Sequence, residues 1–227
     1  MEETVELKII HHVLDAIADQ KLRAGTKLGE NDLAAVFACN RAQIRRALAM
    51  LTGYGVVELV PHRGAFVSIP SEPESRQVFE ARRAIEATIC KNVVQNGKSA
   101  DFARLRAHLA EEESAAQQAS RAEALRLSRR FHLILAQIGQ NEVLARFLEE
   151  LTLRSSLILG CYGSQRASLC AVGEHEEIIE AIEARNAELA VRLLDHHLRH
   201  LEDEVDFDAQ RGVSTPLGEI LGAAQGR

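Results

Sequence analysis

The chain has 227 residues, a hydrophobic fraction of 46% and a formal net charge of −6. This length suffices for two modest domains, and the absence of any run of about 18 apolar residues excludes a transmembrane helix. The acidic start, MEETVELKII, lacks the basic and apolar regions of a signal peptide. The cysteines have no paired spacing and indicate reduced thiols rather than a disulfide framework: Cys39, Cys90, Cys161 and Cys170. We therefore expect a cytoplasmic protein.

Residues 23–67, which follow a first helix, hold the strongest local pattern in the chain. A helix that begins near Glu30 has acidic residues in its first turn, where the helix dipole favours them. Asn40 is a good N-cap for a second helix. The apolar residues of that helix recur at helical spacing and point inward: Ile44, Leu48 and Leu51. Two β-rich runs then flank a basic turn in which Gly64 permits a tight bend. This order predicts a winged helix-turn-helix of three helices plus a β-hairpin wing over residues 1–70.

Arginine and glutamine gather at the start of the second helix, and a short helix of this kind can enter a DNA major groove and donate to base edges and phosphates. The wing tip can reach the backbone or the minor groove. The candidate DNA-binding residues are Asn40, Arg41, Gln43, Arg45, Arg46, His62, Arg63 and Gly64. The alternative is a packing unit with a solvated basic face. Residues 1–70 carry eight basic and eight acidic residues, so the net negative charge belongs to the rest of the chain and does not exclude DNA.

Many residues between positions 24 and 67 match one known family pattern: Ala24-Gly25, Leu28, Glu30, Leu33-Ala34, Asn40-Arg41, Arg45, Ala47-Leu48, Leu51, Gly55-Val56 and Gly64-Ala65-Phe66-Val67. This segment resembles the N-terminal domain of GntR-type bacterial transcription regulators. Three positions depart from the family pattern: Ala24 replaces the usual Pro, Asn40 the usual Ser or Thr, and Arg46 the usual Glu. The resemblance implies that double-stranded DNA is a partner.

The segment IPSEPE, residues 69–74, marks a domain boundary, after which the chain reads as helical. The predicted helices of this second part span 74–96, 100–118, 121–138, 141–159, 173–184 and 186–206. Residues 160–172 read as a loop. The fold class is therefore mainly α, with the winged helix-turn-helix followed by an all-α antiparallel bundle of about six helices in residues 74–207. Residues 208–227 form a tail that we expect to be partly mobile.

The helical part also matches a known domain pattern, carried by Arg82-x-x-x-Glu86, Phe131-His132, Asn141-x-x-Leu144, Glu174-His175-x-x-Ile178 and His197-Leu198. It resembles the FCD effector domain of the FadR/VanR branch of GntR-type regulators. The two resemblances cover nearly the whole chain in the expected order. They imply that residues 74–207 bind a small effector and form a homodimer.

Three histidines fall on apolar faces of three predicted helices: His132, His175 and His197. Each has Leu, Ile or Ala around it at helical spacing and so points inward. A single histidine of this kind is usually a satisfied core residue, but facing helices can bring three imidazoles around one metal ion. Neutral imidazole suits Zn, Ni, Mn or Fe. The nearby pair His196 and His200 is a weaker rival, which reads as part of a solvated face.

The resemblance implies further ligand-binding residues. Metal-binding members of the family have an Asp one turn before the first of these histidines, and this chain has Ser128 there. Two outcomes stay open: a divalent metal held by three histidines and water, or a metal-free pocket in which a ligand carboxylate takes the fourth position. An arginine that matches Arg82 often contacts an effector carboxylate in the family, although a salt bridge to Glu86 or Glu80 would also explain it. The candidate effector-binding residues are Arg82, Ser128, Asn141, Arg154, His132, His175 and His197.

Together these patterns predict a ligand-responsive transcription regulator, most simply a repressor. We expect it to bind a palindromic operator as a homodimer and to be released or repositioned by a small organic acid, with no membrane partner. We expect the signal to pass through the IPSEPE linker and the helix that carries Arg82. Two alternatives remain: an enzyme in which a metal held by the histidines activates water, and a DNA-binding protein without a regulatory ligand.

Overall fold

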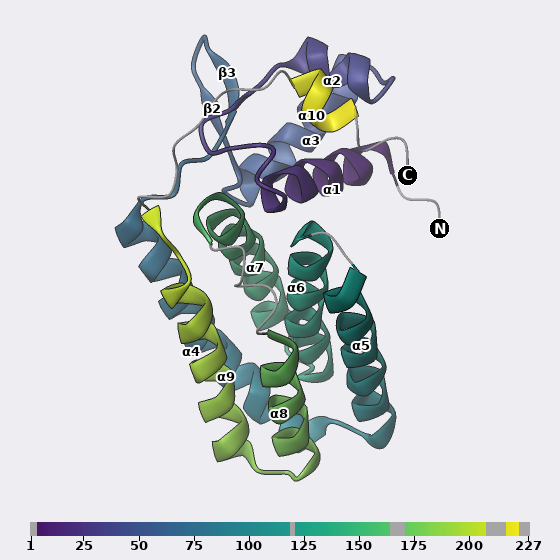
Figure 1. The fold of residues 1–227 in the computed structure, drawn as a ribbon, viewed down its shortest axis with the longest axis vertical. Coiled ribbons are helices and arrows are strands. Elements are labelled where there is room, and N and C mark those ends of the chain that lie inside the picture. The colour runs from purple at the N-terminus through teal and green to yellow at the C-terminus, as the bar shows by residue number, and fades with distance from the viewer. Residues whose placement is uncertain (1–3, 119–120, 164–170, 208–216, 223–227) are drawn as a thin grey trace.

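The computed structural model describes residues 4–118, 121–163, 171–207 and 217–222. It confirms the predicted mainly α architecture, with a winged helix-turn-helix stacked on the end of a helical bundle (Figure 1). The N-terminal domain contains α1 (Val5–Ala18), β1 (Lys27–Leu28), α2 (Glu30–Val36), α3 (Arg41–Gly53), β2 (Val57–Val60) and β3 (Gly64–Val67). The wing is a three-stranded antiparallel sheet in the order β1-β3-β2, so β1 extends the predicted hairpin by one short strand.

The bundle consists of α4 (Glu72–Asn96), α5 (Ser99–Gln118), α6 (Arg121–Ile138), α7 (Glu142–Tyr162), α8 (Ala171–Glu183) and α9 (Ala187–Asp203). The predicted helix ends agree with these bounds to within three residues. The predicted loop at 160–172 is wrong at its start, because α7 continues through Gly160 to Tyr162. Gly160 lies within α7, and its missing side chain lets α7 approach Ile17 of α1 closely. Residues 164–170 of that loop lie outside the described residues.

One apolar core extends across both domains. Its members include Ile9, Val13 and Ile17 from α1 together with Leu157 and Ile158 from α7. A second core fills the far half of the bundle and takes side chains from all six of its helices, α4 to α9. Because burial of apolar area is the main favourable term in folding, the shared core holds the N-terminal domain against the bundle directly. The linker is therefore not the sole connection between them.

Polar contacts reinforce this junction at the end of α1. The Asp19 carboxylate accepts a hydrogen bond of 2.9 Å from the backbone N–H of Ala122, at the start of α6. The Gln20 amide donates to the carbonyl of Gly163, beyond the end of α7, at 3.2 Å. Both bonds satisfy backbone groups that a helix end leaves without intrahelical partners.

The tail predicted at 208–227 contains a short helix that the sequence analysis did not predict, α10 (Leu217–Gly222). It packs against α1 and α2 of the N-terminal domain. Its buried side chains, Leu217, Ile220 and Leu221, belong to the core shared by the two domains. The helix α10 near the C-terminus therefore returns to the N-terminal domain (Figure 1).

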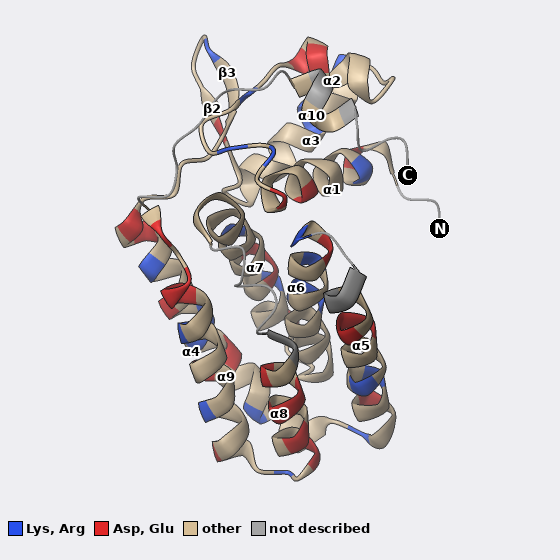
Figure 2. Ribbon diagram, in the orientation of Figure 1, with Lys and Arg blue, Asp and Glu red and all other residues tan. Residues whose placement is uncertain are grey.

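Acidic residues are evident along α5 and α8 (Figure 2). Within the described residues, no helix is both long enough and apolar enough to cross a membrane.

Substitution Gly160→Ala tests the close approach of α1 and α7. A Cβ atom at position 160 would lie 2.8 Å from the carbonyl oxygen of Ile17, so the two helices would have to separate. We expect the free energy of unfolding to fall by about 1–3 kcal/mol, the usual cost of overpacking. Urea denaturation followed by circular dichroism measures it. Gly53→Ala is the matched control, because its methyl group meets nothing within 4 Å. Equal stability of the two variants would contradict the described junction.

Candidate functional site

The start of α3 is fixed by a capping box. The Asn40 side chain accepts from the backbone N–H of Gln43 at 3.0 Å, and the Gln43 side chain accepts from the backbone N–H of Asn40 at 3.1 Å. Each side chain thereby satisfies a backbone donor that the helix leaves free. In the unbound protein, Asn40 and Gln43 therefore set the position of Arg41, the first residue of α3.

The arginines of α3 divide into two groups. Arg41 and Arg45 are both exposed and both bind the carboxylate of Glu30, the first residue of α2, at distances from 2.9 to 3.2 Å. Arg46 instead binds Glu6 of α1 at 2.6 Å. The structure thus places Arg41 and Arg45 together and directs Arg46 toward the first helix, although the sequence analysis grouped all three.

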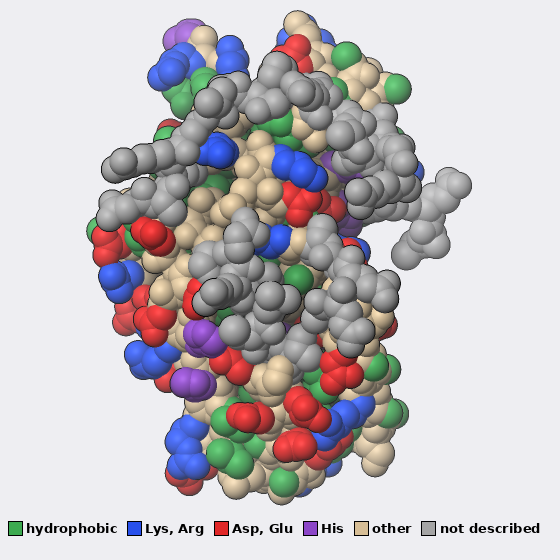
Figure 3. Space-filling view, in the orientation of Figure 1, with side chains coloured by type: hydrophobic (Ala, Val, Ile, Leu, Met, Phe, Trp, Pro, Cys, Tyr) green, Lys and Arg blue, Asp and Glu red, His purple; other side chains and the backbone are tan. Residues whose placement is uncertain are grey.

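The wing presents a small basic tip. Figure 3 shows Lys or Arg side chains and a histidine gathered at the protruding end of the β2–β3 hairpin. The tip residues His62 and Gly64 have positive φ angles of 60° and 98°, the backbone conformation that the tight turn requires. The guanidinium of Arg63 lies 5.3 Å from the ring centre of Phe66, and the side chain of Lys27 on β1 approaches Gly64. Lys27 was not among the predicted wing residues, because it reaches the wing only through the pairing of β1 with β3.

The three candidate histidines meet inside the bundle. His132 lies on α6, His175 on α8 and His197 on α9, with at most 1% of each residue exposed. The Nε2 atom of His197 lies 3.3 Å from the Nε2 atoms of both His132 and His175. One possible ligand atom from each of the three histidines lies within 4.8 Å of the other two, so the three could hold a single metal ion.

Each of these imidazoles has a glutamate on its other nitrogen. The Nδ1 atoms of His132, His175 and His197 lie at 2.5, 2.8 and 2.7 Å from carboxylates of, in that order, Glu86, Glu112 and Glu174. If each Nδ1–H donates to its carboxylate, each Nε2 presents a lone pair, and the three lone pairs converge. Carboxylates that orient metal-binding histidines in this way are a common feature of metal sites. The donor set therefore fits a divalent ion with three protein ligands.

Burial lowers the pKa of His132 to about 4 and that of His197 to about 3, even though a carboxylate beside each ring opposes the shift. The pKa of each orienting glutamate lies at about 2, since attraction to nearby histidines, and for Glu86 first of all to Arg82, outweighs the opposing effect of burial. Near neutral pH, His132 and His197 are therefore neutral and the carboxylates ionised. These are the protonation states that metal binding needs.

Arg82 is linked to the histidine cluster through Glu86, the partner of His132. It is buried, donates from Nε to Glu86 at 2.8 Å and from Nη1 to the Ser155 hydroxyl at 2.9 Å. The salt bridge to Glu86 is thus present, as one interpretation of the sequence expected, and Glu80 is not its partner. The Nη2 atom of Arg82 is also buried, and within the described part of the chain it has no hydrogen-bond partner. This donor is available to an anionic ligand.

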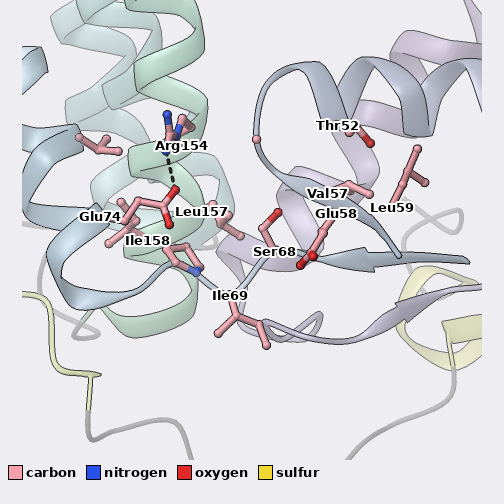
Figure 4. Close-up of a pocket in the computed structure, with 13 residues that line it drawn as sticks. Thr52, Val57, Glu58, Leu59, Ser68, Ile69, Glu74, Arg154, Leu157 and Ile158 are labelled. Atoms are coloured by element: carbon pink, nitrogen blue, oxygen red, sulfur yellow. Dashed lines mark hydrogen bonds and ion pairs between the residues drawn. The ribbon is translucent and has the colours of Figure 1, made fainter. Parts of the chain in front are cut away.

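The other candidate ligand residues lie in different settings. Ser128 is half-buried on α6, one turn before His132. Asn141 caps α7 by accepting from the N–H of Leu144 at 3.1 Å. Arg154 binds Glu74 at 2.5 Å and lines a cavity of about 440 Å³ between the wing and the bundle (Figure 4). The cavity also has Glu58, Ser68 and Ile69 among its lining residues, so Arg154 belongs to the domain junction and not to the histidine cluster.

The sequence analysis did not predict the roles of the three glutamates. Glu86 and Glu174 stood within the quoted motifs, but Glu86 was considered only as a possible salt-bridge partner of Arg82, and Glu174 was given no role. Glu112 lies in an acidic run, and its one local signal is the buried His108 one turn earlier, whose Nε2 lies 3.4 Å from the Glu112 carboxylate. His200, half of the rival histidine pair, binds the second carboxylate oxygen of Glu174 at 2.6 Å.

The pH dependence of stability tests these protonation states in metal-free protein. The pKa values of His132 and His197 lie below the ordinary 6.5, and that of Glu86 lies below the ordinary 4.5, so the unfolded chain binds protons more readily than the folded one. The free energy of unfolding should therefore decrease as the pH falls below about 6.5. Urea titrations at a series of pH values with a chelator measure this slope. His132→Gln should make the slope shallower between about pH 4 and 6.5. An unchanged slope would contradict a neutral, buried His132.

Comparison with known proteins gives matches over both domains. Residues 6–67 match the family described as bacterial regulatory proteins, gntR family, and residues 77–200 match the FCD domain. The chain is 24% identical to the HTH-type transcriptional regulator LutR of Bacillus subtilis over 82% of this chain and 94% of LutR. It is 25% identical to a probable D-xylose utilization operon transcriptional repressor of Paenarthrobacter nicotinovorans, over 86% of each chain.

Among solved structures, Escherichia coli McbR/YncC has the same fold, with a TM-score of 0.74, 16% identity and coverage of 87% of this chain and 95% of that one. The relatives are named as regulators and repressors, which disfavours the enzyme alternative. The winged helix-turn-helix and the histidine-containing bundle thus match two family models in succession along this chain. The chain belongs to the GntR family of bacterial transcription regulators and carries an FCD domain.

Proposed function

We propose that this regulator is a repressor that binds a palindromic operator as a homodimer and responds to a small organic acid bound in its helical domain. The observation that carries the proposal is the convergence of three buried imidazoles, each with a carboxylate on Nδ1, in a bundle attached to a winged helix. A ligand site of this kind, joined to a DNA-binding domain, supports regulation better than DNA binding alone.

Arg41 and Arg45 are the residues proposed to contact bases or phosphates, with Arg63, His62 and Lys27 of the wing at the DNA backbone or minor groove. Both α3 arginines are more than half exposed, with 56% and 61% of their side chains accessible. One winged helix covers only a few base pairs, and a two-fold symmetric dimer naturally reads a two-fold symmetric site. Arg46, which binds Glu6, supports the contact between α1 and α3 and makes a weaker candidate.

His132, His175 and His197 would hold a divalent ion such as Zn, Ni, Mn or Fe. Such an ion would supply a Lewis-acidic binding position for an anionic ligand. Ser128, on the same helix as His132, offers a hydroxyl where the family's anionic ligand residue is missing. The negative charge lies instead on Glu86, Glu112 and Glu174, behind the histidines. The unpartnered Nη2 of Arg82 would donate to the effector carboxylate.

The signal has two structural connections to the DNA-binding domain. Helix α4 follows the linker and carries Arg82, as the sequence analysis proposed. Helix α6 carries His132, and its first turn binds Asp19 at the end of α1. A ligand changes DNA affinity only if it binds the two domain arrangements differently, and both connections join the ligand site to the DNA-binding domain.

Metal affinity tests the carboxylate arrangement. Glu112→Gln should weaken binding of Zn²⁺ by roughly 10–100-fold, the usual effect of removing an outer partner of a metal-binding histidine. Isothermal titration calorimetry measures it. Glu113→Gln is the matched control, because Glu113 is the exposed neighbour on the same helix and carries the same charge. His197→Ala should abolish binding while His196→Ala, one exposed residue earlier, retains it. Equal affinities for all four variants would rule out this metal site.

The response to ligand tests the function as a whole. A DNA duplex selected by the wild-type protein from a random pool should contain an inverted repeat and bind a dimer, as measured by analytical ultracentrifugation. Small mono-, di- and tricarboxylates, with and without Zn²⁺, are then screened for release of that duplex. The Arg82→Lys variant should still bind the duplex but should no longer release it when a carboxylate is added. A lysine cannot donate to Glu86 and Ser155 and also reach the ligand. Arg83→Lys, the adjacent substitution, should respond normally. A monomer on DNA, or an unaltered response of Arg82→Lys, contradicts the proposal.

A further inference from the structure

One carboxylate contacts both exposed arginines of the recognition helix. The Oε2 atom of Glu30 accepts from Nη2 of Arg41 at 2.9 Å and from Nε of Arg41 at 3.2 Å. Both oxygens of Glu30 accept from Nε of Arg45, at 2.9 and 3.0 Å. Arg41 and Arg45 lie one turn apart on α3, and Glu30 approaches them from the start of α2. A single residue of another helix therefore bridges the two side chains.

We propose that Glu30 is a positioning residue for DNA recognition, which holds Arg41 and Arg45 in one shared arrangement and so determines how well the protein discriminates its operator from other DNA. The inference rests on the proposed function of those two arginines. Unrestrained arginine side chains on a helix surface occupy many rotamers, and ordering them on binding costs entropy. A carboxylate that already orders them removes part of that cost for the one DNA sequence whose acceptors fit the arrangement.

The bridge leaves donors free for DNA. A guanidinium has five N–H groups, and Glu30 engages only the Nε group of Arg45, so both Nη groups of Arg45 remain available. In Arg41, Nη1 does not contact Glu30. Two parallel donors are what a guanine edge accepts from an arginine. Glu30 can therefore remain bound to the arginines while they contact a base.

The negative charge of Glu30 has a second consequence. Attraction to phosphates acts on every DNA sequence alike, and one carboxylate between two guanidinium groups reduces it. The pKa of Glu30 is lowered by its hydrogen bonds to Arg45 and Arg41, so the carboxylate stays ionised at neutral pH. The bridge should thus lower affinity for unrelated DNA while it improves the fit to the operator.

Three substitutions separate geometry from charge. Glu30→Gln removes the charge and keeps the side-chain length, whereas Glu30→Asp keeps the charge and shortens the reach to the arginines. Asp32→Asn is the control, because Asp32 lies on the same exposed turn of α2 and its carboxylate turns back toward Gly29. Fluorescence anisotropy measures affinity for the duplex selected by the wild type and for a scrambled duplex of equal length. Thermal unfolding confirms that each variant is folded.

We expect both Glu30 substitutions to reduce the ratio of the two affinities by roughly tenfold, the order of one well-made base contact. Glu30→Gln should also bind the scrambled duplex more tightly, and Glu30→Asp should not. Asp32→Asn should leave the ratio unchanged. If the Glu30 variants keep the wild-type ratio while Arg41→Ala loses it, the positioning role is wrong and the arginine assignment stands. If Arg41→Ala and Arg45→Ala also keep the ratio, the proposed recognition itself fails.

Discussion

The cost of burying ionisable groups governs the interior of this bundle. Three imidazoles and the carboxylates of Glu86 and Glu112 are almost fully removed from solvent, and such groups persist in a folded protein only when they are paired and hydrogen-bonded. Pairing each Nδ1 with a carboxylate meets this need and leaves the three Nε2 atoms facing one another. The same constraint extends outward, because the buried carboxylate of Glu86 is paired with Arg82, and the buried guanidinium of Arg82 also donates to the hydroxyl of Ser155.

This arrangement makes the proposed ligand site and the fold interdependent. Helices α4, α5, α6, α8 and α9 each contribute a histidine or a partner of a histidine, so a change in the position of one helix alters a hydrogen bond at the cluster. The cluster lies beside the second apolar core, where Phe131 stacks on His175 with ring centres 3.9 Å apart. Tightly packed interiors transmit displacements instead of absorbing them, which suits the proposed role of this domain in coupling ligand binding to the DNA-binding domain.

Much of this organisation could be predicted from the sequence, for identifiable reasons. Ile44, Leu48 and Leu51 mark one face of α3, and Asn40 marks its start, because helical periodicity and capping are local properties. The inward direction of His132, His175 and His197 follows from the same periodicity. The partner of each histidine could not be predicted, since Glu112 and His175 are 63 positions apart and meet only through packing of α5 on α8. The same holds for the pairing of Glu30 with Arg41 and of Arg154 with Glu74.

The return of α10 to the first domain affects the order in which the protein can fold. Domains usually fold as they emerge during synthesis, the N-terminal one first. Here Leu217, Ile220 and Leu221 complete apolar packing against α1 and α2, although they are made after the whole bundle. The DNA-binding domain therefore cannot close its core while the ribosome is still adding the effector domain. Newly made protein thus completes the apolar core of its N-terminal domain only once the FCD domain is already present.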